Sequence, residues 1–330
     1  MPLRFWRWRP ASSASCAARR RMCCRRRRPS AWSAAALADL RNHRRKRKAV
    51  QGIWALLTNA HLSGFVTGRI YSGPLKRFCV PGMNCYACPG ALGACPIGAL
   101  QAMVTGRKPR FAFYVLGWLA LLGVLLGRFI CGWLCLFGLI QELLYKIPTP
   151  KIAVPKKLDG RLRYLKYGFL LVFVILLPTI LRDEFGMSVP YFCKWICPVG
   201  MLEGGVPLAI LDKGIRSAAH ALYAWKLAIL IMILAASVFI HRPFCKYVCP
   251  LGAFYALFQK ISVLRMEVDT DACVQCGACA KVCHMQVDPV KTPNSAECIR
   301  CGECIHACPQ NALKFRAVGK STSGAERRTT

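Results

Sequence analysis

Two stretches near the C-terminus share one spacing of cysteines and decide the interpretation of the chain. Residues 273–283 read CVQCGACAKVC, and residues 298–309 read CIRCGECIHACP. In both stretches, successive cysteines are separated by two, two and three residues. Cysteines this close along a chain are poorly placed to bond one another, but their sulfurs can converge on a shared metal group. The repeat therefore predicts two neighbouring metal sites.

This spacing is typical of bacterial-type [4Fe–4S] sites, in which three thiolates of one run bind a cluster and the fourth reaches the other cluster. The interleaving predicts two [4Fe–4S] clusters, the first bound by Cys273, Cys276, Cys279 and Cys308, and the second by Cys283, Cys298, Cys301 and Cys304. Zinc is the alternative, because four thiolates also suit that metal, although structural zinc usually takes two separated pairs. His284 stands where the first run would carry proline.

The composition indicates a membrane protein. Of the 330 residues 55% are hydrophobic, and the mean hydropathy is +0.34. Four apolar segments approach the roughly 17–25 residues that cross a bilayer, and they cover residues 50–71, 111–127, 167–181 and 218–240. The expected fold is therefore mostly α, with about four membrane spans followed by a small α+β two-cluster ferredoxin-type domain.

Charge predicts the orientation and the domain boundaries. Basic residues collect at 41–48 and 146–166, which predicts that both ends of a multi-pass plasma-membrane protein lie in the cytoplasm. The formal net charge of +33 is not a nucleic-acid signal, because basic residues are not interleaved with aromatics on a folded domain. We expect four parts: an N-terminal extension (1–48), a membrane domain (49–264), the ferredoxin-type domain (265–316) and a disordered tail (317–330).

The extension is strongly basic. It holds 16 Lys and Arg residues against one acid, Asp39. One interpretation is a disordered tail. The other, which we favour, is that translation starts later, between Leu37 and Val50.

Further cysteines follow the membrane segments. Cys131 and Cys135 come after the second span, and Cys245 and Cys249 after the fourth, so all four are expected beside the ferredoxin-type domain. If each Cys-x3-Cys pair lies on one helix, its i and i+4 sulfurs face the same way. The two pairs could therefore hold a third cluster.

The opposite membrane face is expected to carry six more cysteines. CPIGAL (95–100) resembles CPQNAL (308–313), the close of a ferredoxin run, which suggests a fourth cluster on Cys79, Cys85, Cys88 and Cys95. Cys193 and Cys197 remain contributors without an assigned partner. Disulfides are the alternative on this face, because the compartment outside the cytoplasm is oxidising.

The paired CGWxC and FCxxxCP motifs, followed by a double ferredoxin run, resemble the membrane-bound polyferredoxin family over about residues 49–316. That family includes the quinol dehydrogenase membrane subunit of periplasmic nitrate reductase systems and the C-terminal part of the nitrous-oxide-reductase regulator. The sequence departs from the family pattern at Leu136, which replaces a proline after Cys135, and in the additional pair Cys193 and Cys197. The resemblance implies electron transfer, with quinol as a candidate donor.

Two functional hypotheses follow. In the first, the protein relays electrons between a quinol or another membrane partner and a redox protein, as a non-catalytic component of an oxidoreductase system with lipid around it. In the second, it is an accessory or regulatory ferredoxin that senses redox state or serves metalloenzyme maturation. The sequence predicts no catalytic residue and has no nucleotide-binding fingerprint. His61, His220 and His241 lie in or beside spans and are candidates to bind quinone or haem, although such histidines are more often packed.

Overall fold

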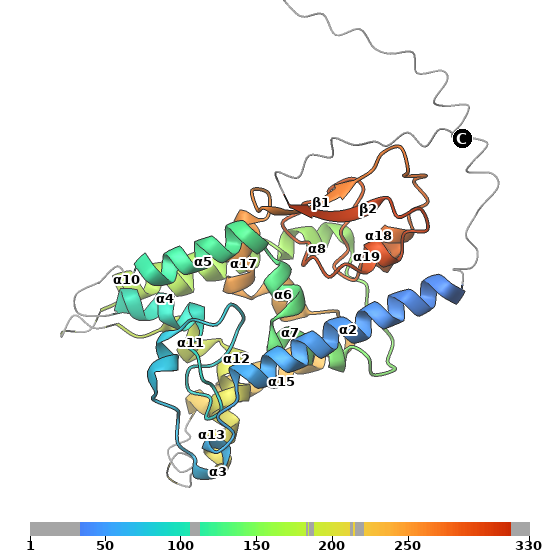
Figure 1. Cartoon of the computed structure of the whole chain (residues 1–330). Coiled ribbons are helices and arrows are strands. Elements are labelled where there is room, and N and C mark those ends of the chain that lie inside the picture. The colour runs from blue at the N-terminus through green and yellow to red at the C-terminus, as the bar shows by residue number, and fades with distance from the viewer. Residues whose placement is uncertain are drawn as a thin grey trace, which may run out of the picture.

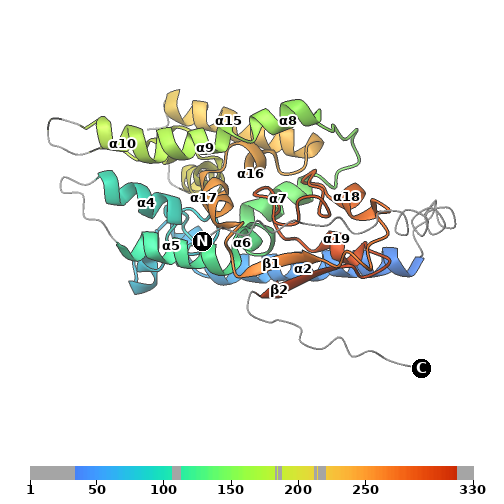
Figure 2. The ribbon, with the colours of Figure 1, turned by 90° about the horizontal axis from the view of Figure 1, so that it is seen from above.

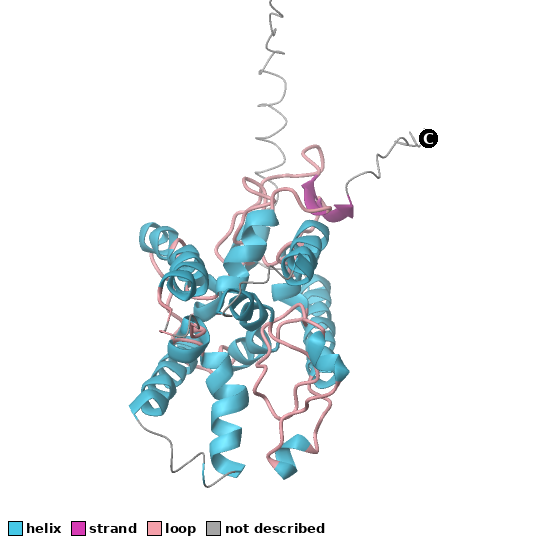
Figure 3. Ribbon diagram, turned by 90° about the vertical axis from the view of Figure 1, so that its left-hand side faces the viewer, coloured by secondary structure: helices cyan, strands magenta, loops and turns pink. Residues whose placement is uncertain are grey.

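The computed structural model describes residues 34–105, 113–182, 184, 188–211, 214 and 221–317. These residues are mostly helical and carry one two-stranded sheet at one end of the molecule (Figures 1 and 3). Residues 1–33 of the expected extension and 318–330 of the expected tail lie outside the described residues, as does His220.

The helices of the N-terminal half are α2 (Ala34–Thr58), α3 (Gly64–Thr67), η1 (Pro74–Arg77), α4 (Pro96–Thr105), α5 (Phe113–Leu126), α6 (Phe129–Trp133) and α7 (Leu136–Leu144). Residues 34–48, expected to belong to a basic extension that is either disordered or outside the translated protein, form the first 15 residues of α2. The segment 50–71, expected to span the membrane, is not one helix. It breaks after Thr58, where the Asn59 side chain donates to the Ala55 carbonyl (3.0 Å) and so competes with continued helix.

The second half continues with α8 (Lys156–Leu162), α9 (Leu165–Phe169), the π-helical turn η2 (Leu170–Leu176), α10 (Leu177–Ile180), α11 (Tyr191–Trp195), α12 (Pro198–Gly200), the π-helical turn η3 (Met201–Gly205), α13 (Val206–Leu211), α15 (Ala221–Phe239), α16 (Pro243–Tyr247) and α17 (Pro250–Phe258). Two described helices are long and apolar enough to cross a membrane, Lys156–Ile180 and Ala221–Phe239. Only 22% and 17% of their most apolar windows are buried in the protein, so they are not core helices. The described part of the expected span 111–127 forms a helix of 14 residues, shorter than the usual span.

The C-terminal part is small and built around loops. Its elements are β1 (Leu264–Val268), α18 (Ala278–Val282), α19 (Glu303–His306) and β2 (Leu313–Ala317). The strands pair antiparallel, with Met266 opposite Phe315. The two cysteine runs lie between these strands in the sequence. α2 runs beside this part in both views, close to α19 (Figures 1 and 2).

Candidate functional site

The cysteines of the C-terminal part line two cavities. Cys273, Cys276, Cys279 and Cys308 line the first, which we name site 1. Cys283, Cys298, Cys301 and Cys304 line the second, site 2. These are the two interleaved sets that the spacing predicts, with the last cysteine of each run reaching the other set. Gly277 and Gly302 adopt left-handed backbone conformations (φ +73° and +82°) between the second and third cysteine of each run, where the chain turns around its cavity.

A third cavity lies where two membrane motifs meet. It is lined by Cys131, Cys135, Cys245 and Cys249, and we name it site 3. The first cysteine of each pair lies in a short helix, α6 or α16, whereas the second caps the next helix in an extended conformation. The sequence predicts that both cysteines of a pair lie on one helix face. This prediction is wrong, because the chain leaves the first helix before it reaches the second cysteine. In the second pair, Pro250 helps end the first helix, because a residue before proline disfavours helical geometry.

One motif recurs at these helix starts. Four cysteines, Cys95, Cys135, Cys197 and Cys249, are each followed three residues later by a glycine. The Cys249 sulfur accepts a hydrogen bond from the Gly252 N–H (3.3 Å), and the Cys197 sulfur accepts one from the Gly200 N–H (3.4 Å). Such N–H donors favour the negatively charged thiolate, which is the form that binds iron.

Two arginines flank site 3, and each contacts the cysteine motif that the other arginine precedes. Arg128 and Arg242 each stand three residues before the first cysteine of a pair, and both are fully buried. Arg128 Nη2 donates to the Cys245 carbonyl (3.3 Å), and Arg242 Nη1 donates to the Cys131 carbonyl (2.5 Å). Each guanidinium thus reaches across to the other motif. We name these two residues the arginine clasp.

The clasp supplies positive charge to site 3. The Nε atoms of Arg128 and Arg242 are buried and have no hydrogen-bond partner in the described part of the chain. Burial raises the pKa of the Cys135 thiol to about 11, so positive charge nearby is needed to favour its thiolate form. Four thiolates and buried, incompletely paired cations suit an anionic iron–sulfur cluster, which would be held by the four cysteines of site 3.

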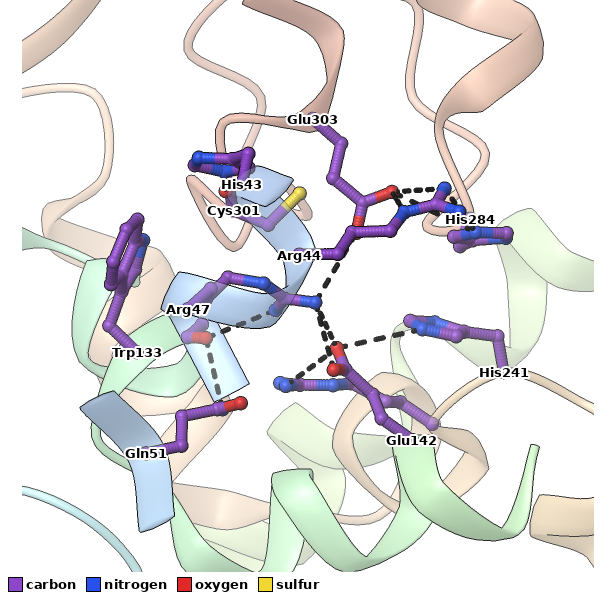
Figure 4. A network of polar contacts seen from close by, with 12 residues as sticks. His43, Arg44, Arg47, Gln51, Trp133, Glu142, His241, His284, Cys301 and Glu303 are labelled. Atoms are coloured by element: carbon purple, nitrogen blue, oxygen red, sulfur yellow. Dashed lines mark hydrogen bonds and ion pairs between the residues drawn. The ribbon is translucent and has the colours of Figure 1, made fainter. Parts of the chain in front are cut away.

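A network of buried charges joins site 3 to site 2 (Figure 4). Arg47 on α2 donates to Glu142 (2.8 Å) and to Glu303 (3.2 Å), and Arg242 also pairs with Glu142 (2.9 Å). Burial opposes ionisation, but Arg242 and Arg47 outweigh it and hold the pKa of Glu142 below its usual value. His43 contacts the carbonyl of Cys301 (2.8 Å), a cysteine of site 2. α2 therefore connects the two sites. The interpretation of residues 1–48 as a basic extension did not predict this role.

The fourth cavity, at about 910 Å³, is larger than the cavities of sites 1 to 3, and we name it site 4. Five cysteines line it: Cys79, Cys85, Cys95, Cys193 and Cys197. Cys88, which the sequence grouped with the first three, does not line the cavity, and its sulfur contacts the Asn59 side chain (3.8 Å). The structure thus gives Cys193 and Cys197 partners that the sequence could not assign.

The cysteines in the described residues are free thiols, with no disulfide among them. No three His, Cys, Asp or Glu side chains of this part converge closely enough to hold a single metal ion. His61 packs against Tyr71, and its Nδ1 contacts the Pro89 carbonyl (3.0 Å). His241 stacks on His284 (4.8 Å between ring centroids), and its buried Nδ1 has no partner among the described residues.

Known families and proteins are similar to this chain in sequence. A family described as "4Fe-4S binding domain" matches residues 93–113, 109–155, 167–206 and 224–268, and each match contains one of the Cys-x2-Gly motifs. A second family with the same description matches residues 292–314. No solved structure matches the chain.

Several curated proteins are similar along much of their length. The uncharacterized protein MJ0750 of Methanocaldococcus jannaschii is 32% identical over 62% of this chain and 79% of its own length. The putative electron transport protein YccM of Escherichia coli is 28% identical, over 67% of this chain and 62% of its own length. The methylamine utilization ferredoxin-type protein MauN of Methylorubrum extorquens is 27% identical, over 78% and 86%.

The cysteine-lined sites and these matches define an iron–sulfur electron-transport protein with a ferredoxin-type domain. Its two long apolar helices, which are mostly unburied, indicate that it is a membrane protein. The chain belongs to the membrane-bound polyferredoxin family.

Proposed function

We propose that the protein relays electrons along a row of [4Fe–4S] clusters, between a quinol or another membrane partner and a redox protein. The observation that carries the proposal is that each of sites 1, 2, 3 and 4 is in contact with the next through residues that line or border both. The cysteines named for sites 1, 2 and 3 would bind one cluster each, and site 4 would form the far end of the row. Bound iron–sulfur clusters supply one-electron chemistry, whose potentials the protein sets through charge, hydrogen bonds and burial.

Neighbouring sites are in contact, as a relay requires, because electron tunnelling falls steeply with distance. Cys279 of site 1 and Cys304 of site 2 belong to one small hydrophobic core with Met266 and Leu313. Between sites 2 and 3, Gly132 packs on Ile299, and a Cβ at position 132 would lie 2.3 Å from the Ile299 carbonyl oxygen. Only a glycine allows this approach.

Sites 3 and 4 share a wall. Met83 lines both cavities. The loop that carries it is held by Tyr255, whose hydroxyl donates to the Pro81 carbonyl (2.9 Å). The two cavities therefore border one another at Met83. This contact supports electron passage between the membrane part and the ferredoxin-type domain.

We further propose a multi-pass arrangement in the plasma membrane, with the ferredoxin-type domain in the cytoplasm. The basic residues of 41–48 support this orientation, because they lie on the half of α2 that contacts that domain, and cytoplasmic flanks are rich in Lys and Arg. The spacing of the cysteine sulfurs favours clusters over zinc, since no three candidate ligands in the described chain converge on a single ion.

Vesicles test the relay directly. Protein loaded with clusters would be incorporated into liposomes that contain ferricyanide, with dithionite added outside. We expect ferricyanide reduction well above that of protein-free vesicles, and its loss in Cys245→Ala, which removes one thiolate of site 3. Flux no greater than that of protein-free vesicles, from protein that retains its iron, would refute the proposal.

The second candidate, an accessory or regulatory ferredoxin, predicts a different outcome. Its clusters would change redox state without sustained turnover. A soluble menaquinol analogue and an artificial acceptor, mixed with detergent-solubilised protein, separate the two. Continuous acceptor reduction supports a relay with quinol as donor, whereas a single reduction of the clusters supports the accessory role.

A further inference from the structure

Site 4 is assembled from one complete and one incomplete copy of the motif that builds site 3. Cys193 and Cys197 form one complete Cys-x3-Cys pair, but Cys95 has Ala91 four residues before it. Ala91 stands where the pairs of site 3 have their first cysteine, and it is fully buried. This copy of the motif therefore lacks only the first sulfur. A four-thiolate site built on this plan needs one more cysteine from elsewhere in the chain.

Cys85 is in the position to supply that thiolate. A Cβ placed on Gly200 would lie 3.7 Å from the Cys85 sulfur and 3.8 Å from the Cys197 sulfur, so both sulfurs face the same point. The Cys85 backbone N–H donates to buried Glu203 (2.6 Å). That bond ties the loop of Cys85 to η3, directly after the helix that Cys197 caps.

The other two sulfurs line the same cavity, Cys95 directly before α4 and Cys193 within α11. A contact between these two elements holds them together. Gln101, a buried residue of α4, donates from its Nε2 to the Cys193 sulfur (3.8 Å).

Cys79 and Cys88 are placed differently. Cys79 is held by a backbone bridge to Ala94, and its carbonyl accepts a hydrogen bond from Trp118 (3.0 Å). Neither of these contacts links Cys79 to the helices that carry Cys193 and Cys197. Cys88 does not line the cavity.

The cavity also has polar groups that suit an anionic cluster. Asn84 is 3% exposed and lines the cavity, yet neither side-chain amide atom has a hydrogen-bond partner in the described residues. Lys76 and Lys226 line the same cavity. An amide donor and two ammonium groups would offset the negative charge of thiolate-bound iron, as the arginine clasp would in site 3.

We propose that site 4 binds a fourth [4Fe–4S] cluster through Cys85, Cys95, Cys193 and Cys197, and that Cys79 and Cys88 are not ligands. Each of the four thiols releases its proton as its sulfur bonds to iron. The inference rests on the proposed relay, for which this cluster is the end farthest from the ferredoxin-type domain.

The test measures iron and acid-labile sulfide per chain in protein purified without oxygen, for the parent and four alanine variants. The parent should hold about sixteen irons. Cys85→Ala and Cys193→Ala should lose about a quarter of the iron and one cluster signal in the electron paramagnetic resonance spectrum of the reduced protein. Cys79→Ala and Cys88→Ala, matched cysteine-to-alanine changes beside the same cavity, should keep the full content. Retained signals from sites 1 to 3 would show that the chain is folded.

Two outcomes would overturn the assignment: about twelve irons in the parent, or iron loss in Cys79→Ala or Cys88→Ala but not in Cys193→Ala. Either result leaves the relay through sites 1 to 3 open to the vesicle assay. Conversely, sixteen irons with no vesicle flux would refute the relay and leave the ligand assignment in place.

Discussion

Replacing Arg242 by glutamine should lower the reduction potential of the site 3 cluster. A reduced cluster carries one more negative charge than an oxidised one, so a nearby guanidinium favours reduction. Arg242 is fully buried, and its Nη1 lies 2.5 Å from the carbonyl oxygen of Cys131, one of the site 3 cysteines. Its removal therefore withdraws a positive charge from the immediate surroundings of the cluster.

Electrostatics gives the magnitude. At a distance of about 6 Å and an effective dielectric constant of about 20, one unit charge contributes about 3 kcal/mol. For a one-electron couple, 1.4 kcal/mol corresponds to about 59 mV, so the potential should fall by roughly 120 mV. Glu142 keeps Arg47 as a partner in the variant, which limits the number of unpaired charges left behind.

Potentiometric titration followed by electron paramagnetic resonance measures the shift. Arg242→Lys keeps the charge and should recover most of the potential, although it loses the forked contact. Arg316→Gln removes an arginine from an exposed pair with Glu267 and should change nothing, because solvent and salt screen exposed charges. A glutamine variant with full iron content and an unchanged site 3 potential would refute the reasoning, and so would an equal shift in every cluster.

Three further predictions concern the charges and the clusters. Glu303→Gln removes the carboxylate that pairs with Arg44 and Arg47, and should cost about 3 kcal/mol of unfolding free energy in a denaturant titration, whereas exposed Glu267→Gln should cost less than about 1 kcal/mol. Glu142 has a lowered pKa in the folded protein, so its stabilisation is present above the unfolded value of about 4.3 and is lost as the pH falls through the folded value. Acid unfolding followed by circular dichroism should thus be shallower in Glu142→Gln, and an identical pH profile would contradict this account. Removing iron with a chelator should sharply increase hydrogen exchange in residues 264–317 while α15 stays protected, because the small domain has little apolar core without its clusters; unchanged exchange there would argue against this dependence.

The sequence predicted what depends on short-range spacing. The cysteines of sites 1 and 2 are grouped in the structure as the two runs imply. With only two residues between successive cysteines, the first three sulfurs of each run can hardly avoid facing the same cavity. Site 3 was predicted from two separate pairs, although not its local geometry. The expected single helix face fails because Cys135 and Cys249 adopt extended conformations as helix caps.

Long-range contacts explain what the sequence left open. Arg47 meets Glu303 across 256 residues of chain, and no local pattern in residues 41–48 indicates that pairing. Cys193 lacked a partner because its neighbours in the cavity come from residues 79–95, about a hundred positions earlier. One signal was available: an arginine three residues before the first cysteine occurs in both pairs of site 3, whereas Pro190 stands at that position in the third pair.

The charges around site 3 tie the folding of the membrane part to its cluster. Two groups flank the site: Arg128 and Lys166 share Glu297, while Arg242 and Arg47 share Glu142. Arg47 also pairs with buried Glu303, so these four buried cations face three carboxylates and an excess of positive charge remains. Burying such charges without counterions is costly. An oxidised [4Fe–4S] cluster with four thiolates carries a charge of about −2, which would offset the excess. The arginines that raise the reduction potential of the cluster would then also depend on its negative charge to remain buried. Protein without iron should therefore be least stable at the junction of α7, α16 and the ferredoxin-type domain.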